Sequence, residues 1–395
     1  MLKEYLPYTL LREEIEKRNY FIQKVDKDMN WKGGELSVPF KGNKASSFKF
    51  GGLTAEANIT EDGYVRGTVS AYKELWGSMV FNDKDLHQHG DLKQSFIKIL
   101  PDTIDMFVDS MGELVSQNLL NGASFATVTG LTNAATGHLQ VDRIERFSLG
   151  MYLKVGDKVG WVRAINMNTS DITVFNAISG GAAVDFTAAV AIVVGDVFYI
   201  DGADTDSFTS LPSQLLSAAN GGSATLFGQT KTAYPHLQAH NFDGSSITAS
   251  NLLAKIFDFY NETRRIGKGN PTDVIMSYKH LANCMKVLEV ARDYTATDKK
   301  ASVYGWTEID VVGVKGKLKL VGVNEMNDEN MLMLDWRSLK LHSNGMFERR
   351  RSPEGKEYYE VRSTSGYKYI VDTRFFGELV THTPSYSGIA YGINY

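Results

Sequence analysis

The chain has 395 residues, of which 43% are hydrophobic and 11% aromatic, and its formal net charge is −4. This length and apolar content exclude a disordered chain and predict two or three domains with a sizeable buried core. The nearly neutral charge excludes a protein whose main task is strong electrostatic binding of nucleic acid. A surface that lies against packed DNA without binding it is compatible with this charge.

The first predicted elements are a helix over residues 1 to about 20 and an extended arm over 30–76. In the arm, an alternating stretch at 35–41 leads to a tip rich in Lys, Ser and Gly at 41–52, and a second alternating stretch returns at 64–72. A two-stranded ribbon by itself is marginally stable in water. Because no domain is visible around the arm, we expect it to lie on a neighbouring copy of the chain.

A long helix is predicted over residues 91–120, after a strand-like stretch at 75–81. Apolar residues recur in it every three or four positions, and Asn121-Gly122 is a typical helix end. Such a helix would be about 45 Å long if straight. Pro101 either kinks this helix or begins a new one.

Residues 138–212 change in composition: Val, Ile, Thr, Ala and Gly dominate, and short strands alternate with turns. The runs 162–165 and 171–175 predict a hairpin. Two similar Gly-Asp turns, within 154–159 and 193–198, separate further β-rich runs. The segment therefore predicts a small barrel or sandwich inserted into the main domain.

The remaining chain mixes helices and strands without regular alternation, which favours the α+β class over a parallel α/β sheet. Helices are predicted from Ser250 or Asn251 to Arg265 and from Ser277 to about Arg292. Predicted strands lie at 271–276, 311–323, 330–335, 357–361 and from 367 onward.

The sequence contains one cysteine, Cys284, so it can form no intrachain disulfide. Cys284 lies in a helical pattern, and we expect a small buried apolar side chain there. No apolar run reaches membrane-spanning length, and the residues after Met1 are too charged for a secretion signal. We therefore expect a protein that is made and used in a cytoplasm, without a membrane partner.

Catalytic motifs are absent from the sequence: it has no phosphate-binding loop, no dinucleotide fingerprint and no nucleophile elbow. His87 and His89 fit a solvated polar stretch better than a metal site, and 201–206 fits an acidic surface turn better than a calcium loop. We expect no enzyme activity, no catalytic, cofactor-binding or metal-binding residues, and no cofactor. The cluster 349–351 could contact a phosphate, pair with a partner's carboxylate or remain solvated.

The order of these parts resembles the major capsid protein of tailed bacteriophages, with its Hong Kong 97-type capsid fold. Two sequence segments carry the resemblance. Asn270-Pro-Thr-Asp-Val-Ile-Met-Ser277 is similar to the central strand and following helix of that family's axial domain. Val371-Asp-Thr-Arg-Phe-Phe-Gly-Glu-Leu379, followed by Pro384 and Gly388, is similar to its closing peripheral strand.

The resemblance implies six parts in the chain. They are an N-terminal arm (1–29), an extended loop (30–76), a peripheral domain with a long spine helix (77–137), a β-rich insertion (138–212), an axial domain (213–335) and C-terminal peripheral strands (336–395).

The function implied is self-assembly, as pentamers and hexamers, into the icosahedral capsid of a virion. The shell would form in the cytoplasm of a host bacterium and enclose double-stranded DNA, which it would contact non-specifically. The N-terminal arm begins within a few residues of Met1, so scaffolding would come from a separate protein or be absent; a portal and decoration proteins are further expected partners. Candidate residues for contacts between subunits are Lys41, Lys44, Phe48, Lys49, Phe50, Arg349, Arg350 and Arg351.

Some members of the family cross-link a loop lysine to an asparagine. No motif in this sequence identifies a matching asparagine or a catalytic acid, so we expect non-covalent contacts at the loop tip.

Two other functions remain open at this point. An encapsulin-like cellular compartment would share the fold, and the DNA content of purified particles would separate it from a capsid. A β-rich phage adhesion protein would use aromatic residues of the insertion to bind glycans, although alternation favours most of them as core. Those aromatic residues are Phe147, Tyr152, Trp161, Phe175 and Phe186.

Overall fold

The protein is described by a computed structural model, and it forms two compact units. Unit 1 combines Met1–Leu120 with Thr209–Tyr395, and unit 2 is Asn121–Phe208. The described residues are 15–16, 18–32, 34–41, 63–70, 73–82, 92–187, 191–267, 269–290, 308–313, 316–349, 359–363 and 366–395. They mix helices and strands as the α+β prediction requires.

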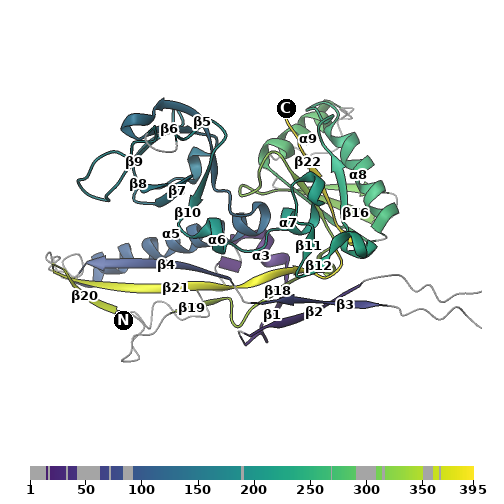
Figure 1. Cartoon of the computed structure of the whole chain (residues 1–395), viewed down its shortest axis with the longest axis horizontal. Helices are drawn as coiled ribbons and strands as arrows, with labels where there is room; N and C mark the ends of the chain where they lie inside the picture. The colour runs from purple at the N-terminus through teal and green to yellow at the C-terminus, as the bar shows by residue number, and fades with distance from the viewer. Residues whose placement is uncertain are drawn as a thin grey trace, which may run out of the picture. The chain divides into compact units, whose positions relative to one another are not determined.

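The first sheet of unit 1 is organised around one long strand, β21 (Gly366–Thr381). Along one edge it pairs antiparallel with β4 (Lys73–Asn82), as Figure 1 shows for the two long arrows. Its other edge pairs with several short strands in turn. These are β20 (Tyr359–Ser363), β19 (Phe347–Arg349) and β18 (Leu339–His342), and β18 also pairs with β1 (Asp26–Asp28).

The long helix α5 (Leu92–Asn121) packs on this sheet. Val108, Met111 and Val115 form a buried stripe, whereas Met106 is 70% exposed. A Cβ atom on Gly77 of β4 would lie 2.9 Å from the ring of Phe107, so the helix and the strand are in close contact.

The helix α5 is continuous through Pro101. No separate helix begins at this proline, which was one of the two alternatives predicted. Proline removes only one hydrogen bond of the ladder, and a helix of 30 residues retains the bonds on both sides.

Within the described residues, the predicted N-terminal helix is interrupted at Asn19. Residues 15, 16 and 18 are helical, and a short helix α3 (Tyr20–Lys24) follows. Asn19 separates the two because its side chain accepts a hydrogen bond from the backbone N–H of Ile22, which is the geometry of a helix N-cap. The rest of the predicted helix, 1–14, lies outside the described residues.

The second sheet of unit 1 is mixed and has a buried centre. Its two central strands, β14 (Asp273–Met276) and β17 (Met331–Leu334), are buried at every position, which explains why they are apolar apart from Asp273. The other strands are β13 (His240–Asp243), β22 (Gly388–Tyr391), β16 (Gly316–Gly322) and β15 (Glu308–Gly313).

Two amphipathic helices contribute to the core of this sheet, α8 (Leu252–Gly267) and α9 (Tyr278–Val290). Ile256 and Phe259 of α8 pack in one cluster with Cys284 of α9. Cys284 is fully buried, as predicted, and burial raises the pKa of its thiol to about 12.

The end of the chain differs from the predicted layout, in which residues 336–395 all form peripheral strands. Strand β22 leaves the sheet of β21 and pairs with β13 and β17 instead. The 3₁₀ turn at Pro384–Tyr386 redirects the chain, and Gly388 permits the close approach, since a Cβ there would lie 2.7 Å from Phe259.

Unit 2 is a closed six-stranded barrel in the order β10-β5-β6-β9-β8-β7. The predicted hairpin is the pair β8–β9, in register through Ile165 and Ile172. The strands are β5 (Ala126–Asn133), β6 (His138–Val141), β7 (Tyr152–Val155), β8 (Lys158–Asn166), β9 (Asp171–Phe175) and β10 (Val197–Ile200).

The barrel begins earlier than the predicted insertion at 138–212, because the unit starts at Asn121 and ends at Phe208. Strand β5 pairs with both β6 and β10, so the barrel cannot close without it. Of the aromatic residues considered as a glycan platform, Phe147 and Phe186 are buried and belong to the core.

Four further short elements belong to the described chain. They are helices α6 (Ala203–Asp206) and α7 (Leu211–Leu215) and the two-residue strands β11 (Thr225–Leu226) and β12 (Gln229–Thr230).

Candidate functional site at the base of the arm

The arm begins as a two-stranded ribbon of β2 (Leu36–Lys41) and β3 (Tyr64–Val69), which we call the arm base. The antiparallel register runs from Leu36 opposite Val69 to Lys41 opposite Tyr64. The predicted hairpin is therefore present at its base, and its tip at 42–62 lies outside the described residues.

The arm base packs against its own chain, contrary to the expectation that the ribbon has no core of its own. Val38, Phe40 and Val69 are buried on one face of the ribbon. They form a cluster with Trp31, Leu226, Leu237 and Val380. Because the partner segments are up to some three hundred positions away in sequence, local patterns could not associate them with the ribbon.

Close backbone contacts fix the position of β3. The backbone N–H of Thr68 donates to the carbonyl oxygen of Phe227 at 2.9 Å, and the ring of Phe227 stacks on Phe40 with centroids 6.2 Å apart. A Cβ on Gly67 would lie 2.2 Å from the Phe40 ring, so glycine is required at this position. The base of the arm thus has a defined direction relative to unit 1.

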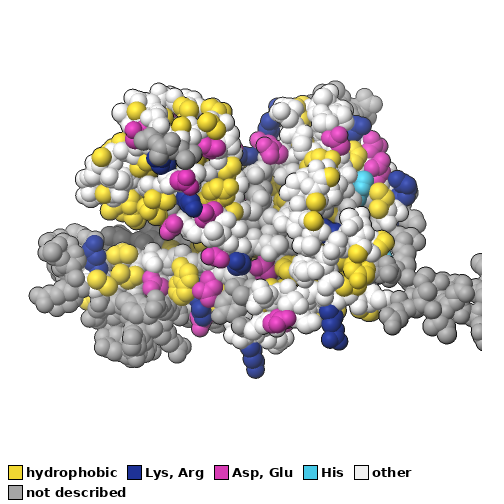
Figure 2. Space-filling view, in the orientation of Figure 1, with side chains coloured by type: hydrophobic (Ala, Val, Ile, Leu, Met, Phe, Trp, Pro, Cys, Tyr) yellow, Lys and Arg dark blue, Asp and Glu magenta, His cyan; other side chains and the backbone are white. Residues whose placement is uncertain are grey.

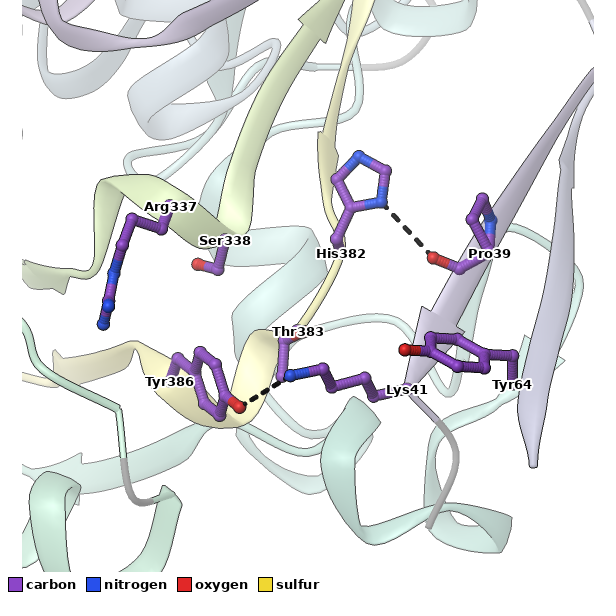
Figure 3. A pocket seen from close by; sticks show the side chains of 8 residues that line it. All are labelled: Pro39, Lys41, Tyr64, Arg337, Ser338, His382, Thr383 and Tyr386. Carbon is purple, nitrogen blue, oxygen red and sulfur yellow. Dashed lines mark hydrogen bonds between the residues drawn. The ribbon is translucent and has the colours of Figure 1, made fainter. Parts of the chain in front are cut away.

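A pocket of about 510 Å³ opens beside the arm base (Figure 3). Its walls combine the arm with two distant turns of unit 1. It is lined by Pro39, Lys41, Tyr64, Arg337, Ser338, His382, Thr383 and Tyr386.

Lys41 and Tyr386 join the arm to the 3₁₀ turn at 384–386. The Lys41 ammonium donates a hydrogen bond to the Tyr386 hydroxyl at 2.9 Å and lies 5.0 Å from the ring centroid. This hydrogen bond raises the pKa of Lys41, so the side chain is charged at neutral pH. The contact combines a charge-assisted hydrogen bond with a cation–π interaction.

Arg337 supplies the second cation of the pocket. Its guanidinium donates to both oxygens of Asp335, Nε at 2.9 Å and Nη2 at 2.7 Å. Burial acts to raise the pKa of Asp335, but hydrogen bonds from Arg337 and from the backbone of Asn270 outweigh it and lower this pKa. Asp335 is thus a buried carboxylate, while 72% of the Arg337 side chain is exposed.

Two histidines lie behind the arm strand β2. His382 Nδ1 is 3.3 Å from the carbonyl oxygen of Pro39, and its Nε2 is 3.4 Å from Nε2 of His342. Burial lowers the pKa of both histidines, that of His342 to about 4. Both rings are therefore neutral at neutral pH, and Lys41 and Arg337 alone make the lining positive.

Among the predicted contact residues, the structure brings only Lys41 into this pocket. Arg349 ends β19 with its backbone paired to Thr373, and its side chain is not described. Glu348, which precedes it on β19, accepts a hydrogen bond from Arg374 at 2.5 Å. Outside the described residues lie Lys44, Phe48, Lys49, Phe50, Arg350 and Arg351.

Sequence reasoning missed Arg337, His382 and Tyr386. No motif links them to Lys41, since roughly three hundred positions separate them from it. The sequence offered one indication of this site: Pro384 predicts a turn after the long strand, and the pocket forms at that turn.

The described residues contain no cluster of three or more His, Cys, Asp or Glu side chains that could hold a metal ion. Across the same part of the chain, no helix is both long and apolar enough to cross a membrane.

No family model matches the sequence, and no curated protein matches it either. Comparison with solved structures does return matches. The fold is similar to that of phage capsid proteins. One is the capsid of cyanophage A-1(L), with 11% identity and a TM-score of 0.46, covering 93% of this chain and 91% of that one. Another is the capsid of Myoviridae phage XM1, with 8% identity and a TM-score of 0.42, covering 94% and 91%.

An encapsulin is among the matches as well. The SrpI encapsulin of Synechococcus elongatus has 6% identity and a TM-score of 0.40, with 95% of this chain and 87% of that one covered. At these identities the likeness concerns the fold.

Proposed function

We propose that this chain is a structural, non-enzymatic protein that assembles with copies of itself into a closed shell. The observation that carries the proposal is the arm base: a two-stranded ribbon fixed on unit 1 by buried side chains and by backbone contacts. A ribbon held so firmly at its base has a set direction. The ribbon can therefore direct the rest of the arm toward a neighbouring subunit.

The rest of unit 1 supports this proposal. The 30-residue helix α5 packs on the β4–β21 sheet, and a separate mixed sheet follows with α8 and α9. This order of arm, long helix, sheet and second sheet is the one that gives the sequence its resemblance to phage capsid proteins.

More specifically, the proposed shell is the icosahedral capsid of a tailed double-stranded DNA bacteriophage, built from pentamers and hexamers. A separate scaffolding protein, a portal and decoration proteins are the proposed partners, and assembly takes place in the host cytoplasm. Lys41 and the contact candidates at 44–50 and 349–351 are proposed to lie at subunit contacts.

The packaged DNA is proposed to be contacted without sequence preference. Charges of both signs are interspersed on the face drawn in Figure 2, where the coloured side chains form no continuous basic field. A duplex-binding surface would instead neutralise many phosphates with clustered Lys and Arg.

Electron microscopy of the purified protein, expressed alone and with its scaffolding protein, tests the proposal. Closed particles are the expected result. Replacing 42–52 by a Gly/Ser segment of equal length should prevent closure while leaving the melting temperature of the free subunit unchanged. A wild-type chain that stays monomeric under all conditions would contradict the proposal.

The encapsulin-like alternative makes a different prediction about contents. A capsid produced in infected cells should contain double-stranded DNA, whereas a cellular compartment should contain a cargo protein. Nuclease-protected DNA in purified particles therefore decides between the two.

A further inference from the structure

The pocket beside the arm base has a lining suited to an anion. Of its eight lining residues, Lys41 and Arg337 are cations, and neither Asp nor Glu is among them. Asp335 pairs with Arg337 from outside the lining. Two cations and this one carboxylate leave a single uncompensated positive charge.

Hydroxyl groups lie beside the two cations. The Tyr386 hydroxyl accepts from Lys41, so its own O–H is left to donate to another group. In Figure 3 the Tyr386 ring lies between Arg337 and the Lys41 ammonium, and the Tyr64 hydroxyl points toward Lys41. Tyr64 is 71% exposed, so a ligand can approach from this side.

We propose that this pocket binds the carboxylate of an Asp or Glu side chain from a second copy of the chain. One carboxylate neutralises the single excess charge and can accept hydrogen bonds from Lys41 and Tyr386. A volume of about 510 Å³ accommodates such a side chain with its stem. A nucleic-acid backbone fits less well, because it carries a row of phosphates and needs a matching row of cations.

The pocket also depends on the arm. Pro39, Lys41 and Tyr64 belong to the arm base, and the opposite wall comes from 337–338 and 382–386. A carboxylate bound between them would hold the two walls together, and so would fix the arm base when a neighbour is in place. This inference rests on the proposed shell function and names the partner group at one contact.

The first experiment measures the yield of closed shells for variants at Lys41. Lys41→Met should lower the yield about tenfold, since the variant loses a charge-assisted hydrogen bond to the bound carboxylate. Lys41→Arg should retain assembly. Lys32→Met is the matched control, because Lys32 is an exposed lysine that lies before the arm strand and outside the pocket lining. Arg337 is left unchanged, since its removal would leave Asp335 buried without its cation.

The second experiment identifies the occupant. A photo-reactive benzoylphenylalanine replaces Tyr64, and shells are assembled from a mixture of ¹⁴N- and ¹⁵N-labelled chains. We expect cross-linked peptides of mixed isotope composition, with an Asp or Glu next to the site of cross-linking. Substituting that acid by Lys should block assembly in an otherwise wild-type chain. Combining this substitution with Lys41→Glu, which reverses both charges, should restore assembly.

The outcomes separate the two proposals. If wild-type shells form but Lys41→Met assembles like wild type, the pocket inference is wrong and the shell function stands. The same conclusion follows if the residue at position 64 cross-links only to its own chain or only to nucleic acid. If the wild-type chain forms no shells, the shell function fails, and a second copy is excluded as the occupant.

Discussion

Glu378 is a buried carboxyl group near the end of a long strand. It lies on β21, is 2% exposed, and accepts a hydrogen bond from the backbone N–H of Thr209 at 2.7 Å. Burial raises its pKa to about 7, although the hydrogen bonds from Thr209 and the charge of Lys73 act in the opposite direction. The folded chain therefore binds a proton at pH values where the unfolded chain has released it.

This shift predicts a pH-dependent stability. Because the folded-state pKa is raised from 4.5 to about 7, the contribution of Glu378 is fully present below about pH 4.5 and is lost as the pH rises to 7. Glu378→Gln should remove this dependence and stabilise the subunit at pH 8 by up to about 3 kcal/mol. Urea denaturation of the free subunit at pH 5 and pH 8 measures the effect.

The control for this prediction is Glu35→Gln, which changes an exposed glutamate and should leave the pH profile unchanged. A Glu378→Gln profile that runs parallel to that of wild type would show that Glu378 does not titrate in this range.

At the scale of elements, the ribbon of β2 and β3 depends on a few side chains for its attachment. Phe40 is fully buried, stacks on Phe227 and also contacts the ring of His382. A ribbon of two strands has little stability beyond such packing.

Phe40→Ala should therefore release the arm base from unit 1. We expect a loss of about 3–5 kcal/mol in the free energy of unfolding, which is the usual cost of removing a buried Phe ring. Hydrogen exchange should accelerate in 36–41 and 64–69 while β14 remains protected. Tyr64→Ala, at a mostly exposed position of the same ribbon, should change stability by less than about 0.5 kcal/mol. Equal effects of the two substitutions would show that the ribbon is not held by this face.

Elements with a strong local period were predicted well. The apolar stripe of α5 and the caps of α8 and α9 place these helices within a few residues of their observed bounds. The single strand β5 was missed as part of the barrel, because its exposed end, 131–133, interrupts the alternation. Its place in the barrel is determined by pairing with β6, the next strand along the chain, and with β10, which is distant in sequence.

At the scale of the whole molecule, the division into two units predicts that unit 2 folds alone. Its barrel closes on itself through β5–β10, so it leaves no strand edge that requires unit 1. Its core contains Leu139, Val162 and Ile172, all with no exposed area.

A fragment of residues 121–208 should accordingly be monomeric and unfold in one cooperative transition, observed by circular dichroism during heating. A shorter fragment, 138–208, lacks β5 and should not show such a transition. A non-cooperative melt of the longer fragment would mean that unit 2 requires the rest of the chain.

The sequence by itself determined the α+β class, the long helix, the β-rich insertion, the ribbon and the buried Cys284, because each follows from periodicity or composition over a short stretch. Only the tertiary structure decided which sheet receives β22, what supports the arm base, and that Lys41 meets Tyr386 and Arg337 in one pocket. Those outcomes depend on contacts between segments that are far apart in the sequence, where the free energy of packing, rather than any local pattern, selects the partner.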